Sequence, residues 1–549
     1  MVVQQSFARS SLFLVAICSA VALNAQARQT TAGPTRADSL RGGYGPFRAN
    51  NDLVYYHLNI RVDPEKKFIS GKNSIRFRML SDGNRVQIDL HPSLAVDKIM
   101  LGAVELKYER DASAVFVNFP ETLRRGREYS IDFHYSGTPL EIGRGGGGIG
   151  FRTDANGKHF INTVCEGVGS ATWWPSKDQW HDEVDSMLIS VEIPNGLMDV
   201  SNGKFVASTD LKDGYTRWDW RVQYPINNYN VALNIGRYEH FADRLGDLPL
   251  DFYVLPENLD KARKQFAQVS PMLDAFQKYF GEYPFAKDGY KLVEVPYAGM
   301  EHQSAVAYGN RFANGYLERD FAGVGTSLKF DFIIIHESGH EWFGNAISAA
   351  DVSDMWIHEG WTTYLESLYV EDRFGRDEAI RYVNGYKSKV QNSEPIITQR
   401  GIHREPMQDM YFKGALFLNT LRSVVNDDAV WRGALRDFYQ EFKHRNILTE
   451  DVVRYFNTRL KRDLTPVFDQ YLRRAELPIL ELAFNERDGL MSYRWKAGER
   501  AFAMPVRVGT AGTWTILEPT TDWQTMPMAI PKAAIEVATD LYYVEVRKL

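Results

Sequence analysis

The sequence is poor in cysteine and carries no strong excess of charge. Its 549 residues include only two cysteines, Cys18 and Cys165, which excludes a disulfide framework and a metal site made of cysteines alone. No base that could activate Cys165 is evident, so we interpret this thiol as structural. The 64 Lys and Arg against 70 Asp and Glu leave a net charge of −6. This argues against a nucleic-acid partner, because such binding neutralises phosphates with cationic side chains.

A long hydrophobic run is also missing. The apolar stretch Leu12–Leu23 has twelve residues, whereas a membrane-spanning helix needs about 20. Arg9 precedes this stretch and Ala25-Gln26-Ala27 follows it, which is the order of a secretory signal peptide. An uncleaved membrane anchor is the alternative, and the stretch is too short for it. We expect residues 1–27 to be a signal peptide, and the mature protein to be exported, periplasmic or secreted, without a membrane span.

What remains is an ordinary globular composition with 44% hydrophobic and 13% aromatic residues. At about 100–200 residues per domain, the length suggests about three or four domains. Residues 28–50 are polar and rich in Gly and Arg, so we expect a disordered leader. Residues 51–242 alternate apolar and polar side chains, as at Leu58, Ile60 and Val62, which predicts a β domain. The glycine run 145–150 fits GxGxxG, but no strand–helix unit surrounds it, so we expect a mobile loop.

The period changes in the region 243–478, where helical spacing dominates. The apolar residues of one stretch lie three and four positions apart, which predicts a core-facing helix: Phe266, Val269, Leu273, Phe276 and Phe280. Pro271 interrupts this stretch and predicts a kink or a break into two helices. Alternation returns after Pro478, so residues 479–549 are expected to form a small β domain.

The central region contains an HExxH motif, His336-Glu337-Ser338-Gly339-His340. On a helix, residues four apart share a face, so both imidazoles can reach one zinc ion with Glu337 beside them. Glu359 follows His340 after 18 intervening residues and supplies a candidate third ligand. Three protein ligands are the usual number in a catalytic zinc site. The alternative is a pair of surface histidines and an ordinary helical glutamate, but the apolar run 332–335 predicts burial.

Three segments together resemble a known family. They read PYAGMEH at 296–302, HESGHEWFGN at 336–345 and WIHEGWTTYLE at 356–366. They are similar to the motifs GxMEN, HELAHQWFGN and WLNEGFAxYxE of the aminopeptidase N family of zinc metallopeptidases, the gluzincins of peptidase family M1. The resemblance is specific from about 280 to 420. It implies a multidomain fold of α and β structure: an N-terminal β-saddle, a thermolysin-like, mostly helical catalytic domain, and a small C-terminal β-sandwich.

The resemblance also implies catalytic roles. His336, His340 and Glu359 match the ligands of a single zinc ion. Glu337 matches the general base that takes a proton from the zinc-activated water and delivers it to the leaving amine. Tyr411 begins a YFKGA segment that matches the family's YxKGA, whose tyrosine stabilises the oxyanion. A core aromatic residue is the alternative for Tyr411.

Substrate recognition follows from the same resemblance. Glu301 matches the glutamate that binds the free α-amine of the peptide, although such a residue by itself would most often lie on the surface. Its neighbours Ala298, Gly299 and Met300 belong to the same motif, and the two small residues would let the backbone approach the substrate. Glu166 is a candidate second amine anchor, with a structural carboxylate as the alternative.

Several positions depart from the family pattern or leave a role open. His302 stands where Asn is usual, Glu341 replaces a Gln and adds charge to the motif helix, and Val164 replaces the Gln of a QxE segment. Asp354 either orients a zinc-ligand histidine or is a solvated residue at a helix start. His358 adjoins Glu359 but points about 100° away from it on a helix, so we exclude it as a ligand.

These features predict a zinc-dependent aminopeptidase acting on peptides with a free N-terminus. A zinc endopeptidase and a non-catalytic peptide-binding protein on a peptidase fold are the alternatives. The family also includes a bifunctional leukotriene epoxide hydrolase, but only about 70 residues follow Pro478, too few for the family's large helical domain. We therefore expect an open active site that tolerates longer peptides.

Overall fold

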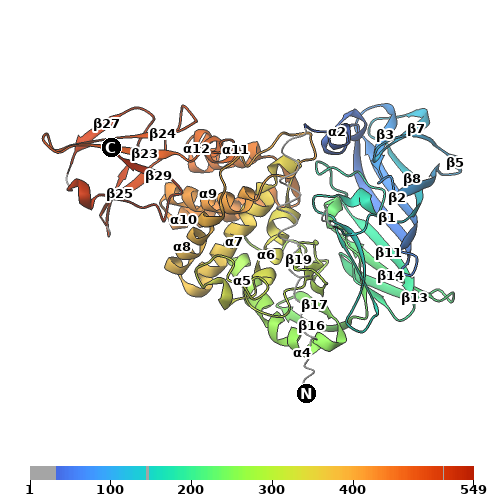
Figure 1. Ribbon diagram of the computed structural model, residues 1–549. Helices are drawn as coiled ribbons and strands as arrows, with labels where there is room; N and C mark the ends of the chain where they lie inside the picture. The colour runs from blue at the N-terminus through green and yellow to red at the C-terminus, as the bar shows by residue number, and fades with distance from the viewer. Residues whose placement is uncertain (1–32, 144–146, 511, 529) are drawn as a thin grey trace, which may run out of the picture.

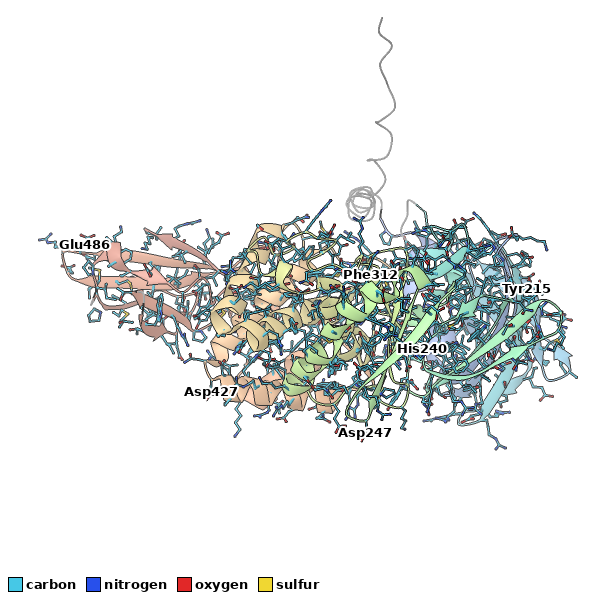
Figure 2. All side chains as sticks on the ribbon, turned by 90° about the horizontal axis from the view of Figure 1, so that it is seen from below. Tyr215, His240, Asp247, Phe312, Asp427 and Glu486 are labelled. Atoms are coloured by element: carbon cyan, nitrogen blue, oxygen red, sulfur yellow. The ribbon has the colours of Figure 1, made fainter. Side chains whose placement is uncertain are left out.

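The computed structural model describes residues 33–143, 147–510, 512–528 and 530–549. It has a β-rich N-terminal part, a mainly helical centre and a C-terminal β part, arranged side by side in that order (Figure 1). The view from below in Figure 2 shows the same row, with Tyr215 near one end and Glu486 near the other. The expected signal peptide and residues 144–146 of the glycine-rich segment lie outside the described residues. None of the helices in the described ranges is long and apolar enough to cross a membrane.

The N-terminal domain is built on a large sheet whose inner face carries the alternating apolar residues. Leu58, Ile60 and Val62 are fully buried, as their spacing predicts. The strand that carries these residues, β1 (Asn51–Asp63), pairs antiparallel with β2 (Phe68–Met79). It pairs parallel with β11 (Met187–Pro194), which lies more than a hundred residues later in the sequence. In the described part of the chain the strand order is β13 (Lys204–Asp210), β14 (Tyr215–Val222), β11 (Met187–Pro194), β1 (Asn51–Asp63), β2 (Phe68–Met79), β8 (Glu128–Gly137), β4 (Leu94–Leu101) and β5 (Val104–Glu105).

Two smaller sheets complete this domain. One has the order β3 (Gly83–Asp89), β7 (Ala114–Leu123) and β6 (Lys107–Asp111). The other has the order β12 (Met198–Asp199), β15 (Asn234–Gly236), β10 (His159–Val164) and β9 (Gly148–Thr153). The last strand corrects one expectation, because the second half of the glycine run is paired with β10 instead of forming a mobile loop. A side chain at Gly148 would collide with the carbonyl of Leu140, 2.2 Å from its Cβ, so glycine permits this close strand.

The expectation of a disordered leader is wrong for residues 33–50. They form α2 (Arg36–Gly42) and α3 (Pro46–Ala49), which pack on the N-terminal domain. Arg48 is completely buried; it pairs with Asp89 and donates to the carbonyl oxygens of Leu40, Arg41 and Gly43. The buried guanidinium of Arg48 is thus satisfied by nearby carbonyl oxygens and by Asp89, which lies 41 residues later in the sequence.

The central domain begins earlier than expected. Its sheet has the order β16 (Glu239–Leu245), β17 (Leu248–Val254), β18 (Tyr290–Glu294), β20 (Val306–Tyr308) and β19 (Gly299–Met300). A boundary at 242/243 would therefore cut β16, whose pairing with β17 assigns it to the second domain. The alternating pattern is the same on both sides of the boundary, so it did not reveal where one sheet ends and the next begins.

Helices cover this sheet and make up the rest of the domain. The expected break precedes Pro271: α4 (Leu259–Gln265) ends in a tighter turn, and Pro271 lies in the first turn of α5 (Val269–Tyr279), where it displaces no helical hydrogen bond. The other helices in the described ranges are α6 (Phe332–Gly339), α7 (Trp356–Phe374), α8 (Arg376–Gly385), α9 (Asp409–Val425), α10 (Asp428–Phe442), α11 (Thr449–Leu460) and α12 (Thr465–Leu472). A two-stranded pair, β21 (Ile347–Ala349) and β22 (Arg445–Ile447), lies between them.

The C-terminal domain consists of two small sheets, as the alternation after Pro478 predicts. The first has the order β27 (Gln524–Pro527), β24 (Leu490–Lys496), β23 (Ile479–Asn485) and β29 (Glu545–Lys548). The second has the order β26 (Thr513–Leu517), β25 (Val506–Thr510) and β28 (Glu536–Val537). Leu480, Leu482 and Trp495 are buried in this domain. The expected multidomain α and β architecture is therefore confirmed.

Candidate active site

The HExxH motif lies on α6, whose first turn is apolar and buried. Asp331 caps this helix, with its carboxylate accepting from the backbone N–H groups of Ile333 and Ile334. Burial raises the pKa of Asp331 to about 6. After His340 the helix opens into a wider turn that contains Gly344 at φ +114 and returns the chain through β21 to α7. This path brings the first turn of α7 against the motif.

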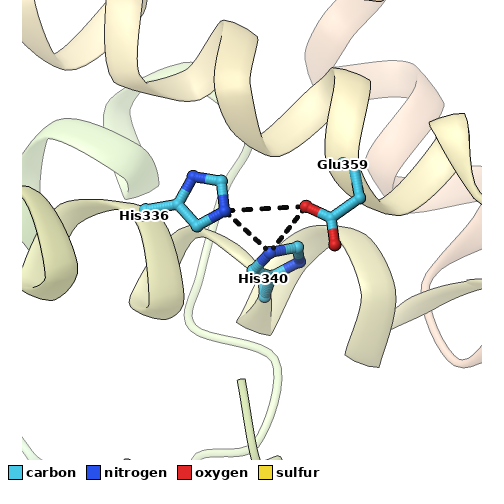
Figure 3. A group of neighbouring side chains, drawn as sticks. All are labelled: His336, His340 and Glu359. Atoms are coloured by element: carbon cyan, nitrogen blue, oxygen red, sulfur yellow. Dashed lines mark hydrogen bonds and ion pairs between the residues drawn. The ribbon is translucent and has the colours of Figure 1, made fainter. Parts of the chain in front are cut away.

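Three side chains converge where the sequence predicted the metal site. His340 Nε2 lies 3.3 Å from His336 Nε2 and 3.3 Å from Glu359 Oε2, and His336 Nε2 lies 3.6 Å from the same oxygen. Figure 3 shows both imidazoles on α6 facing the carboxylate on α7. Apart from these two nitrogens, Glu359 Oε2 has no hydrogen-bond partner among the described residues, although it is buried. A buried carboxylate oxygen with no donor beside it is the kind of atom that a cation satisfies.

The far side of each imidazole is held by a partner. Glu366 Oε1 lies 2.7 Å from His336 Nδ1, and the carbonyl oxygen of Phe343 lies 2.9 Å from His340 Nδ1. Both partners accept, so Nδ1 carries the proton of each neutral ring and Nε2 keeps a free lone pair toward Glu359. Two such nitrogens and one carboxylate oxygen are the donor set that zinc takes in catalytic sites. The residues present therefore fit a zinc ion.

Asp354 takes neither of the two roles considered for it. It is completely buried, and its carboxylate forms a two-point contact with Arg400 at 2.9 Å for each pair of atoms. It also accepts from the backbone and the hydroxyl of Thr449. Asp354 thus joins the start of α7 to α11, and Glu366 orients the histidine instead.

Glu337 lies beside the metal donors and against the bare backbone of Gly299. A Cβ at Gly299 would come within 2.8 Å of Glu337 Cγ and 2.9 Å of Glu337 Oε1. Burial raises the pKa of Glu337 to about 7, which is a suitable value for a general base near neutral pH. Of the neighbouring motif residues, Met300 is buried on β19, and Ala298 accepts a backbone hydrogen bond from Gly309.

Tyr411 approaches the same site from the start of α9. Its ring lies 6.2 Å from the ring of His336, with the two planes inclined by 25°. Burial and the surrounding carboxylates raise the pKa of Tyr411 above its usual value, so the phenol remains a neutral hydrogen-bond donor. The structure thus brings Tyr411 together with the motif residues, as the sequence predicts.

Glu301 is buried in the site. The ligand atoms of Glu301, Glu337 and His340 lie within 4.8 Å of one another, as do those of Glu166, Glu301 and Glu359. Glu166 comes from the N-terminal domain, and its Oε1 is buried without a hydrogen-bond partner in the described ranges. Burial and the neighbouring carboxylates raise the pKa of Glu166 well above its usual value.

Two departures from the family motifs, Glu341 and His302, form no hydrogen bond or ion pair with the metal donors in the described part of the chain. Glu341 is completely buried and accepts from the Tyr283 hydroxyl at 2.6 Å and the Ser304 N–H at 2.9 Å. The carboxylate of Glu341 therefore holds the loop that follows Glu301. Burial raises the pKa of Glu341 to about 7. His302 is also completely buried, and neither ring nitrogen has a partner among the described residues. Burial raises the pKa of Cys165 to about 12, in agreement with a structural thiol.

Two carboxylates of the site, Glu366 and Glu405, were not predicted from the sequence. Glu366 follows Glu359 by seven residues, two helical turns along the same face of α7, and this spacing was the available signal. Glu405 lies in the loop before α9, near the Cβ position of Gly167 (2.9 Å to its Oε2), and burial raises its pKa to about 7. No motif marks Glu405. In the described part of the chain, none of Glu166, Glu301, Glu337, Glu359 and Glu405 forms an ion pair with Lys or Arg.

Comparison with known proteins agrees with the motifs and the geometry. Residues 265–471 match the peptidase family M1 domain, and residues 53–229 match the peptidase M1 N-terminal domain. The chain belongs to peptidase family M1. It is 24% identical to human aminopeptidase B over 504 residues, which cover 81% of this chain and 73% of that protein. It is 23% identical to human endoplasmic reticulum aminopeptidase 1 over 452 residues, which cover 77% of this chain and only 47% of that relative. The chain thus spans less than half of the second relative.

Solved structures of family M1 share the fold. A zinc metallopeptidase from Deinococcus radiodurans, in a form bound to a Tyr-Ser-Ala substrate, superposes with a TM-score of 0.65 at 20% identity. The match covers 78% of this chain and 96% of that structure. A two-domain family member bound to L-tryptophan gives the same TM-score at 21% identity and covers 95% of that chain. The expected assignment to this family and its fold is confirmed.

Proposed function

We propose that this chain is a zinc-dependent aminopeptidase that hydrolyses the N-terminal peptide bond of peptides. The observation that carries the proposal is the position of Glu301, whose carboxylate oxygen lies within 4.8 Å of both Glu337 and His340. A carboxylate this close to the hydrolytic groups pairs with the free ammonium of a substrate and leaves room for one residue before the bond that is cut. An endopeptidase needs the opposite, a path for the chain on both sides of the reacting bond.

His336, His340 and Glu359 would hold a single zinc ion. Zinc supplies Lewis-acid chemistry: it polarises the substrate carbonyl and makes water more acidic. The role of Glu366 is to keep the proton of His336 on Nδ1, so that Nε2 stays available as a ligand.

Glu337 acts as the general base in this proposal. With a pKa near 7 it can take a proton from the attacking water and later deliver the same proton to the leaving amine. Tyr411 donates a hydrogen bond from its phenol to the oxygen on which negative charge develops, an interaction worth about 3–4 kcal/mol when one donor is removed. A neutral phenol suits this task better than a cationic side chain would. A cation here would compete with the substrate ammonium for the carboxylates of the site.

Glu166 and Glu301 form the amine-binding part of the site. Neither carboxylate has a Lys or Arg partner in the described ranges, so no cation of the protein competes with an incoming ammonium. Glu166 Oε1 has no donor there. Burial raises the pKa of both carboxylates, and the arrival of the ammonium would favour their ionised forms. Ala298 precedes the edge strand formed by Gly299 and Met300, and the bare backbone of Gly299 lies against Glu337.

The test compares matched substrates that differ only at the N-terminus. A panel of fluorogenic aminoacyl substrates, free and N-acetylated, is assayed with zinc, after chelation, and after zinc is restored. We expect cleavage of free substrates only, loss on chelation and recovery with zinc. Glu301→Gln should lower kcat/KM for free substrates by at least 100-fold while zinc content stays the same, because the amide cannot pair with the ammonium. Equal cleavage of both forms indicates an endopeptidase, and zinc-loaded protein without any hydrolysis indicates a non-catalytic binding protein.

We also propose that the protein is exported, to the periplasm or the medium. The support is the order of charged, apolar and small residues in the first 27 positions. N-terminal sequencing of the protein recovered from a bacterial host should give Arg28 as the first residue, in the periplasmic or extracellular fraction. Recovery of the intact N-terminus in the cytoplasm would contradict this proposal.

A further inference from the structure

Glu301 has a partner from the other domain. Tyr229 lies on a single helical turn, Asn228–Asn230, of the N-terminal domain and is completely buried. Its hydroxyl donates a hydrogen bond of 2.9 Å to Glu301 Oε1. Because the partner is a phenol and not an ammonium or a guanidinium, this contact holds the carboxylate without neutralising it.

The hydroxyl of Tyr229 also faces His358, which adjoins Glu359 on α7 and was not expected to be a metal ligand. The ring is completely buried, and its Nε2 accepts from the backbone N–H of Ala349 at 2.7 Å. A backbone N–H can only donate, so Nε2 carries no proton and the neutral ring has its proton on Nδ1. Nδ1 lies 3.5 Å from the Tyr229 hydroxyl oxygen, which is a long hydrogen-bond distance. The proton on Nδ1 therefore points toward the phenol oxygen.

Stacking fixes the orientation of both rings. The imidazole of His358 lies 5.1 Å from the ring of Trp180 with planes inclined by 12°, and Tyr229 lies 5.1 Å from the same indole. A rotation of His358 would break the contact with Ala349 and this stack. The Tyr229 oxygen therefore meets a donor on one side, which leaves its own O–H to point at Glu301.

We propose that Tyr229 and His358 are positioning residues. They fix the orientation of the substrate-binding carboxylate of Glu301 through a series of hydrogen bonds donated by uncharged groups. This series of hydrogen bonds runs from the Ala349 amide through His358 and Tyr229 to one oxygen of Glu301. The other oxygen of Glu301 is left for the ammonium of the substrate. This inference rests on the proposed aminopeptidase function, because it assigns a cause to the amine selectivity of that site.

The first test is Tyr229→Phe, which removes only the hydroxyl and keeps the ring against Trp180. We expect KM for free aminoacyl substrates to rise about tenfold, because a hydrogen bond to a charged group is lost. The value of kcat should stay within about threefold, and zinc content should be unchanged. In a Glu301→Gln background the same substitution should have no further effect on KM, because the two residues act through one contact.

His358 offers a pair of substitutions with opposite expectations. In His358→Gln the side-chain oxygen can take the position of Nε2 and accept from Ala349, but a carbon atom then stands at the position of Nδ1, so the donor next to Tyr229 is lost. KM should rise as in Tyr229→Phe while the Tm stays close to that of the wild type. In His358→Asn the shorter amide can still donate to Tyr229, but the Ala349 N–H loses its acceptor. Here the Tm should fall while KM stays close to that of the wild type.

The outcomes separate this inference from the function on which it rests. Wild-type protein that cleaves free and N-acetylated substrates equally overturns the aminopeptidase proposal itself. Wild-type protein that requires the free amine, together with Tyr229→Phe and His358→Gln variants whose KM stays within twofold of it, overturns the positioning role alone. A purely structural role for His358 would lower the Tm of both His358 variants and leave KM unchanged in both.

Discussion

Gly299 is the position where a single methyl group tests the placement of Glu337, the proposed general base. The structure places the Cβ of an alanine there at 2.7 Å from Ile333 Cγ2 and 2.8 Å from Glu337 Cγ. Both contacts are to one face of α6, since the two residues are four apart. The backbone at Gly299 does not have the positive φ that favours glycine, so Gly299→Ala acts through sterics and not through backbone strain.

The expected size of the effect follows from these distances. Carbon atoms pack best at about 3.5–4.0 Å, so Glu337 has to move by about 0.7 Å or more to accommodate the methyl group. Misplacement of a catalytic group by about 1 Å costs roughly 100-fold in rate. Overpacking in a closed site costs about 1–3 kcal/mol of folding free energy, which a domain of this size can tolerate. We therefore expect Gly299→Ala to fold, to bind zinc, and to lose about 100-fold in kcat.

The assay measures kcat, KM, zinc content and Tm for Gly299→Ala and for a matched control. The control is Gly509→Ala in the C-terminal domain, where the new Cβ would lie 2.1 Å from the Thr513 carbonyl oxygen, far from the active site in the chain. It should lower the Tm and leave kcat unchanged. A Gly299→Ala enzyme with normal zinc content and a kcat within threefold of wild type would refute the assigned position of Glu337.

Three further predictions concern the surroundings of the site. Glu366→Ala should weaken zinc binding by about 10–100-fold in a competition titration, because His336 loses the acceptor that orients it; unchanged affinity would contradict this. Arg48→Met should lower the free energy of unfolding by about 3–5 kcal/mol in denaturant titrations, because Asp89 stays buried without its partner; a change below about 1 kcal/mol would show that this ion pair contributes little to stability. The folded-state pKa of Asp331, about 6, exceeds the value of 3.8 for the free side chain, so ionisation disfavours folding. The wild type should therefore lose up to about 3 kcal/mol of stability between pH 4 and pH 6 relative to Asp331→Asn, and a difference that is flat over this range would rule out the titration.

The sequence was most informative where function depends on local spacing. His336 and His340 lie four apart on one helix, so their convergence follows from helical geometry alone. Glu359 was predicted from its spacing to His340 and Tyr411 from its flanking segment, and the structure brings both to the motif. The β domains were equally accessible, because alternation of apolar residues is a property of each strand by itself.

Contacts between distant segments could not be predicted in this way. Arg48 looked like part of a polar leader because its partner Asp89 is 41 residues away, and nothing in either segment marks the pair. The position of Asp354 in the sequence suggested that it could orient a histidine, but its carboxylate accepts hydrogen bonds from the guanidinium of Arg400 instead. In each case the deciding interaction is a tertiary contact between residue types that are common on protein surfaces.

The same distinction divides the active site itself. The metal donors and Glu337 come from α6 and the start of α7, within 24 residues of one another, and a local motif is enough to find them. The partners of Glu301 come from both domains. Tyr229 of the N-terminal domain donates to its carboxylate. Asn345, which lies in the motif segment itself, donates to the Glu301 carbonyl oxygen at 2.8 Å and accepts from Asn230 of the N-terminal domain at the same distance. The proposed amine-binding residues therefore lie at the contact between two domains, whereas the proposed hydrolytic groups lie within one. A change in how the domains dock would alter selectivity for the free N-terminus before it altered the metal site.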